Sequence, residues 1–228
     1  MSSINLIQLL SELGSKRRIF HSEDDFKFCL AWQIQEHFKN KNWNVLLEYP
    51  VMADNKLIYI DIVVKTPEGL LPVELKYKTA TYSFCYNNEL DDDRIELKNQ
   101  SAQDNGRYFF YRDVRRIEQL LGMRAKFGPV GYAVLLTNDP AYWNTPPAGW
   151  ESRNDGHFRM HEGCEPISGK RFWTNKGAYI PPGAGWEALE FHGVHPVQWR
   201  NYMHDNQAPY GGLFRYVLIE LCAAQYIL

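Results

Sequence analysis

The stretch Leu57-Ile-Tyr-Ile-Asp61-Ile-Val-Val-Lys65, then Thr66-Pro67-Glu68-Gly69, then Leu70-Leu-Pro-Val-Glu74-Leu-Lys76-Tyr77 decides the fold. Two runs rich in aliphatic and β-branched residues flank a short turn, which indicates a β-hairpin. The first run is apolar on both faces except at Asp61, as is typical of a strand that is covered on both sides. Burying a carboxylate without a partner is costly, so Asp61 requires a cation, a metal or a strong hydrogen-bond donor.

The turn predicts which residues of the two strands face each other. Its proline stands second and its glycine last, as a type I turn prefers. If the strands pair outward from the turn, starting with Lys65 opposite Leu70, then Asp61 lies directly across from Glu74, with the Cβ atoms about 5 Å apart. Two carboxylates at that separation repel each other unless a cation lies between them. With Lys76 two residues along on the same face, the register predicts a divalent-metal site with an amine beside it.

A more ordinary alternative exists for the second strand. Glu74, Lys76 and Lys78 alternate with apolar residues, as on the solvent-exposed face of any half-buried strand. Asp61 argues against this alternative, because a solvated face on one strand does not explain a carboxylate in the middle of an apolar one.

Helices and strands are expected in a regular order around the hairpin. Ser22 is placed to cap a helix in which Phe26, Leu30, Ile34 and Phe38 recur at helical spacing. The other expected elements are strands over residues 44–51, 57–65 and 71–79, a helix over about 104–121, and strands over 130–137 and 213–223. The order α-β-β-β-α-β, followed by a loop-rich segment and a last strand, predicts a mixed α/β fold.

At this point the sequence resembles a known family. Asp61, twelve intervening residues and Glu74-Leu75-Lys76 resemble the motif of the PD-(D/E)XK nuclease superfamily, although Ile60 stands where the name-giving proline of that motif would be. The α-β-β-β-α-β order over about residues 20–139 is similar to the core of that family. The resemblance implies a restriction-endonuclease-like core with a mixed central sheet flanked by helices. It also implies a metal-dependent nuclease that hydrolyses phosphodiester bonds in DNA.

The resemblance assigns roles to individual residues. It implies that Asp61, Glu74 and the backbone carbonyl of Leu75 hold Mg²⁺, for which Mn²⁺ is expected to substitute. Hard oxygen ligands of this kind suit Mg²⁺. Lys76 would orient or deprotonate the attacking water and stabilise charge on the phosphate.

Many members of the family add an acidic residue from the first helix. Glu23 is the best match for that catalytic position, with Asp24 and Asp25 as rivals.

The second helix is rich in basic residues and is expected to contact nucleic acid through phosphate contacts or base stacking. The candidate residues on this helix are Arg107, Tyr108, Arg112, Arg115 and Arg116. The alternative is a solvated basic face that Asp113 and Glu118 partly neutralise.

Composition narrows the remaining possibilities. The net charge of −2 argues against a protein that coats nucleic acid by bulk charge, but it permits a local basic groove. The four cysteines form no CxxC pair, which favours a reduced, cytoplasmic setting. No apolar run approaches the roughly 18 residues that a membrane-spanning helix needs, so no membrane partner is expected. The expected partner is nucleic acid, in particular DNA, and a homodimer would allow both strands to be cut.

The chain is expected to divide near Asp139. Residues 1–139 form the nuclease-like core, and residues 140–228 form a loop-rich aromatic extension that packs on the same domain and ends in a strand. Five of the seven tryptophans lie in this extension and are expected to pin it to the core.

Two other functions remain open. The first is a catalytically inactive nuclease-like domain that binds nucleic acid or a protein partner. The second is a non-nuclease α/β protein in which Asp61 and Lys76 form a simple buried ion pair.

Overall fold

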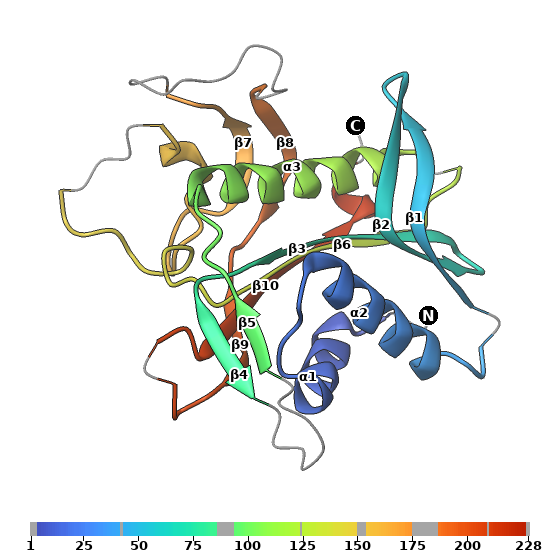
Figure 1. Ribbon diagram of the computed structural model, residues 1–228. Helices are drawn as coiled ribbons and strands as arrows, with labels where there is room; N and C mark the ends of the chain where they lie inside the picture. The colour runs from blue at the N-terminus through green and yellow to red at the C-terminus, as the bar shows by residue number, and fades with distance from the viewer. Residues whose placement is uncertain are drawn as a thin grey trace.

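A six-stranded mixed sheet lies at the centre of the protein, with the strand order β1-β2-β3-β6-β10-β9 (Figure 1). The computed structural model describes residues 4–41, 43–85, 94–123, 125–149, 154–174, 187–208 and 210–226. β3 and β6 run parallel, and the other neighbouring strands of this sheet are antiparallel. The strands are β1 (Asn44–Ala53), β2 (Lys56–Thr66), β3 (Gly69–Lys78), β6 (Val130–Thr137), β9 (Trp199–His204) and β10 (Leu213–Cys222).

The sheet separates two hydrophobic cores. The helices α1 (Leu6–Lys16) and α2 (Glu23–His37) cover one face, and α3 (Gln103–Gly122) covers the other (Figure 1). Phe26 and Leu30 of α2 belong to the first core, whereas the second core contains the apolar face of α3. The expected α/β class with a mixed sheet between helices is therefore confirmed.

Two small hairpins complete these cores. β4 (Tyr82–Cys85) pairs with β5 (Arg94–Leu97), and buried side chains of this pair join the α2-side core. β7 (Ile167–Arg171) pairs with β8 (Leu189–His195), and this pair joins the α3-side core. Two short 3₁₀ turns lie at Gly156–Phe158 (η1) and Ala223–Tyr226 (η2).

The local predictions around the hairpin are confirmed. α2 begins at Glu23, directly after Ser22, whose Oγ accepts a hydrogen bond from the backbone N–H of Asp25 at 3.1 Å. Lys65 pairs with Leu70, as the turn predicts. The predicted register is therefore correct from Thr66 opposite Gly69 to Ile62 opposite Val73, and the pairing stops one pair short of Asp61 and Glu74.

The segment after residue 139 adds strands to the same sheet. β10 pairs with β6, and β9 pairs with β10, so the central sheet continues into this part of the chain. Trp143, Trp173 and Trp199 are buried, in line with the expected role of the tryptophans, while Trp150 and Trp186 lie outside the described residues. Within the described residues, the structure contains no helix that combines the length and the apolar character needed to cross a membrane.

Candidate active site

The candidate site begins where β2 separates from β3. The pairing of β2 with β3 ends at Ile62, which lies opposite Val73. The earlier part of β2, from Lys56 to Ile60, pairs only with β1. In a regular strand Ile60 and Ile62 would point to the same face of the sheet. Here Ile62 points into the α2-side core and Ile60 into the α3-side core, so the alternation of side chains along β2 is broken at Asp61. The partner strand bends at the same level, because Glu48 has a positive φ of 46°. Irregularities of this kind re-aim side chains next to functional sites.

Asp61 lies at this bend and links the two strands after their pairing has ended. Its Oδ2 accepts a hydrogen bond from the backbone N–H of Leu75 at 2.9 Å. Its Oδ1 lies 3.9 Å from Nζ of Lys27, a buried lysine of α2 that also pairs with Asp24 and Glu48. Lys27 is not among the site residues that the sequence predicts.

Glu74 is only 2% exposed and points toward α3. Its Oε1 lies 2.6 Å from Nη1 of Arg116. Burial raises the pKa of Glu74 well above its usual range, and the negative charges of Asp113 and Asp61 raise it further, while Arg116 opposes them. The alternative prediction, in which Glu74 lies on a solvent-exposed face of β3, is therefore wrong.

Lys76 is enclosed by oxygen atoms. Its Nζ donates to the carbonyl of Leu75 at 3.0 Å and lies 3.1 Å from Oδ2 of Asp113 and 3.4 Å from Oε1 of Glu23. Burial alone would lower the pKa of Lys76, but the carboxylates of Asp113 and Glu23 raise it above its ordinary value. No ion pair joins Asp61 to Lys76 in the described residues, so the hypothesis of a simple buried pair between these two residues is wrong.

Glu23 reaches the site because of its position at the start of α2. Besides contacting Lys76, it accepts a hydrogen bond through Oε2 from the backbone N–H of Tyr77 at 2.9 Å. Its rivals turn elsewhere: Asp24 pairs with Lys27, and Asp25 pairs with Arg17. The structure brings Glu23 to Lys76 and leaves the other two acidic residues outside this contact.

Asp113 is a second residue of the site that was not predicted from the sequence. It is 1% exposed, its Oδ1 lies 3.8 Å from Arg116, and neither carboxylate oxygen has a hydrogen-bond partner within the described chain. From the sequence, Asp113 was expected to neutralise part of a solvated basic face. The signal that could have found it is spacing, because Asp113 lies three residues after Phe110 and four before Ile117, on the apolar stripe of α3.

The basic helix needs one correction. Arg107 is buried, with Nε 2.9 Å from Oδ2 of Asp155, and it also donates to the carbonyl of Ala141. Tyr108 is fully buried and donates its hydroxyl to the carbonyl of Glu187. Neither side chain can reach a nucleic acid, because the segment after residue 139 packs over this part of α3.

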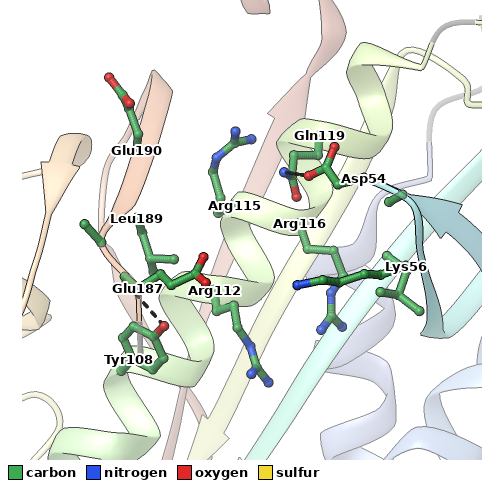
Figure 2. Close-up of a pocket in the computed structure, with 13 residues that line it drawn as sticks. Asp54, Lys56, Tyr108, Arg112, Arg115, Arg116, Gln119, Glu187, Leu189 and Glu190 are labelled. Atoms are coloured by element: carbon green, nitrogen blue, oxygen red, sulfur yellow. Dashed lines mark hydrogen bonds between the residues drawn. The ribbon is translucent and has the colours of Figure 1, made fainter. Parts of the chain in front are cut away.

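The other three arginines of α3 remain at the surface of the fold. Arg116 contacts Glu74, Arg115 lies 4.0 Å from Glu118, and Arg112 lies over the ring of Phe109 at 4.7 Å. All three line one pocket beside the site (Figure 2).

Two observations bear on metal binding. Within the described residues, no three His, Cys, Asp or Glu side chains are grouped as ligands of one ion. Asp61 and Glu74 nevertheless lie close enough for the charge of Asp61 to raise the pKa of Glu74.

Comparisons with known proteins add nothing to the assignment, since no family model, curated protein or solved structure matches the chain.

Proposed function

We propose that this chain is a metal-dependent nuclease that hydrolyses phosphodiester bonds in DNA and has a restriction-endonuclease-like core. The observation that carries the proposal is the convergence of Asp61, Glu74 and Lys76 at the bend of β2, where Glu23 and Asp113 lie within ion-pair distance of the lysine. Buried ionisable groups with perturbed pKa values in one cluster are characteristic of catalytic sites.

The chemistry of the donor atoms fits Mg²⁺. The carboxyl groups of Asp61 and Glu74 and the carbonyl of Leu75 are hard oxygen ligands, and Mg²⁺ is often held by one or two carboxylates together with waters and substrate phosphate. Asp61, Glu74 and Asp113 place three carboxyl groups close enough to raise the pKa of Glu74, and a divalent cation would relieve that repulsion. When bound, such an ion lowers the pKa of its water and neutralises charge on the phosphate.

The surrounding residues have separable roles. Glu23 and Asp113 hold the ammonium group of Lys76 next to Glu74, where it can donate hydrogen bonds to a water or to a phosphate oxygen. Arg116 neutralises Glu74 and is also exposed to the neighbouring pocket. The bend of β2 keeps Asp61 pointed at this cluster through its bond to Leu75.

The test is a cleavage assay with supercoiled plasmid, single-stranded DNA and RNA, each with Mg²⁺, Mn²⁺ or EDTA. We expect metal-dependent cutting of DNA that falls by at least about 10³-fold in Glu74→Ala, since loss of a ligand removes several kcal/mol of transition-state stabilisation. The matched control is Glu68→Ala, an exposed carboxylate in the turn of the same hairpin, which should cut like the unmodified protein. Cutting retained in folded Glu74→Ala contradicts the proposal.

One observation favours a second candidate, a nuclease-like domain that binds DNA or a protein without cutting. Arg116 and Lys27 already lie within ion-pair distance of Glu74 and Asp61, as in a site where protein cations replace the metal. The same samples distinguish the two functions: a binding domain retards DNA on a gel but leaves the plasmid supercoiled with either metal.

A further inference from the structure

A pocket of about 460 Å³ lies beside the candidate site. Its walls are α3, the tip of the β1–β2 hairpin, and the chain leading into β8 (Figure 2). Arg116 lines this pocket and also contacts Glu74, so the pocket and the carboxyl cluster share one side chain.

Four cations line the pocket, and they differ in how they are neutralised. Arg116 is paired with Glu74, and Arg115 lies 4.0 Å from Glu118. Lys56 and Arg112, in contrast, form no ion pair with any residue that the structure describes. Figure 2 shows Lys56 extending from the hairpin toward α3, Arg112 and Arg116 on one side of that helix, and Arg115 on the opposite side.

Arg112 is held in place without a counter-ion. Its guanidinium lies 4.7 Å from the centre of the Phe109 ring, and its Nε is buried with no hydrogen-bond partner in the described part of the chain. A planar cation that is partly desolvated and fixed by stacking is ready to bind an anion, because binding costs it little further ordering.

The acidic residues of the pocket do not neutralise these two cations. Asp54 accepts a hydrogen bond from Nε2 of Gln119 at 2.8 Å. Glu190 points away from the centre of the pocket (Figure 2). Among the described residues, neither Glu190 nor Glu187 forms an ion pair with Lys56 or Arg112.

We infer that this pocket binds a backbone phosphate of DNA next to the one that is cut, through Lys56 and Arg112. The inference rests on the proposed function, since it identifies where the DNA strand would run beyond the cleavage site at Glu74. Lysine and arginine are the usual phosphate ligands of nucleic-acid-binding proteins, and contacts of this kind fix the register of the strand. The pocket also assigns a role to the hairpin tip, which the motif residues do not use.

The experiment measures binding without cleavage. Fluorescence anisotropy of a short fluorescein-labelled DNA duplex in EDTA is recorded for the unmodified chain and for Lys56→Gln and Arg112→Gln. We expect each variant to bind about tenfold more weakly at low salt, as for loss of a hydrogen bond to a charged group. The slope of log affinity against log salt should become shallower by about one unit per variant.

Lys65→Gln is the matched control, because Lys65 is an exposed lysine at the opposite end of the same strand. It should bind within about twofold of the unmodified chain, since it lies outside the pocket. Thermal unfolding of all variants establishes that the fold is intact.

The outcomes separate this inference from the proposed function. If the unmodified chain binds no DNA, or if both pocket variants bind as tightly as the control, the phosphate pocket is wrong. Plasmid cutting with Mg²⁺ is measured on the same samples. If the unmodified chain cuts DNA but both variants bind it normally, the phosphate pocket is wrong and the proposed nuclease function stands. If the variants bind DNA more weakly but the unmodified chain does not cut it, the nuclease function is wrong and the phosphate pocket stands.

Discussion

Helix α3 buries charged side chains in two different ways. Arg107 near its start and Glu118 near its end each have a complete set of partners: Arg107 binds Asp155, and Oε1 of Glu118 lies 2.8 Å from Nε2 of His195. Asp113, between them, has two carboxylate oxygens without hydrogen-bond partners among the described residues, although Lys76 and Arg116 lie within ion-pair distance of it. We call Arg107–Asp155 and Glu118–His195 the closed pairs, because their charged groups are fully partnered. We call Asp113 together with Glu23, Asp61, Glu74 and Lys76 the open cluster.

The difference separates structural charges from the candidate catalytic ones. The closed pairs join α3 to residues 155 and 195, so they attach the later part of the chain to the core. The open cluster joins α3 to Glu74 and Lys76, and it leaves carboxylates close together in a buried site, which costs stability. A fold keeps such an arrangement where a ligand or a reaction needs it.

The largest effect on stability is expected from Glu118→Ala, which removes the carboxylate that pairs with His195. Its carboxylate also accepts a hydrogen bond from the backbone N–H of Gly193 at 2.9 Å, so the variant leaves several buried donors without a partner. We expect the free energy of unfolding at neutral pH to fall by about 3–5 kcal/mol. Chemical denaturation measures it, and cleavage per folded molecule should stay unchanged.

The same variant has a signature in pH. Burial alone would raise the pKa of Glu118, but bonds from His195 and from the N–H groups of Gly193 and His192 lower it below 4.5. A carboxylate whose pKa is depressed in the folded state contributes stability above its ordinary pKa and loses it as the pH falls through the folded value. The difference in stability between the unmodified chain and Glu118→Ala should therefore shrink below about pH 4.5, and a constant difference would show that the pair is not ionic.

Asp113→Asn tests the open cluster from the other side. The amide has a similar shape but no charge, so Lys76 loses one of its two carboxylate partners. We expect kcat for DNA cleavage to fall by about 10- to 100-fold, as for other residues that orient a catalytic group, with little change in KM. Thermal stability should fall by less than in Glu118→Ala, because the amide removes a buried carboxylate without hydrogen bonds but also leaves Lys76 with one carboxylate partner fewer.

Asp104→Asn provides the control for this variant, since Asp104 lies on the first turn of the same helix, away from Lys76. It should change kcat by less than about twofold. A loss of stability in Asp113→Asn as large as that expected for Glu118→Ala would show that Asp113 belongs with the closed pairs.

The sequence was sufficient where one local rule decided the outcome. Proline and glycine in the turn predicted the register of β2 and β3, and the apolar run around Asp61 predicted that this carboxylate needs a partner. The cap at Ser22 predicted the start of α2, which brings Glu23 to the site. Each of these inferences depends on residues close together in the chain.

What the sequence could not supply depends on contacts between distant segments. From the sequence Arg107 was predicted to contact nucleic acid, but in the structure it is buried against Asp155, 48 residues later in the chain. Helix α1 was also missed, although its signal is local: Asn5 caps it and accepts a hydrogen bond from the N–H of Gln8 at 3.1 Å. The bend at Asp61 also went unpredicted, since it requires knowing where the pairing of β2 with β3 stops.

The smallest effect is expected at the start of α2, where two adjacent acidic residues differ only in their partners. Glu23 contacts Lys76 of the open cluster, whereas Asp24 is 70% exposed and pairs with Lys27, a buried lysine of the same helix. We expect Glu23→Gln to lower cleavage about three- to tenfold, because one partner of the lysine loses its charge, and Asp24→Asn to change it by less than about twofold. Both should alter the free energy of unfolding by less than about 1 kcal/mol, since neither charge is fully buried. Equal cleavage by the two variants would show that contact with Lys76 does not matter at this position, and the open cluster would then reduce to Asp61, Glu74, Lys76 and Asp113.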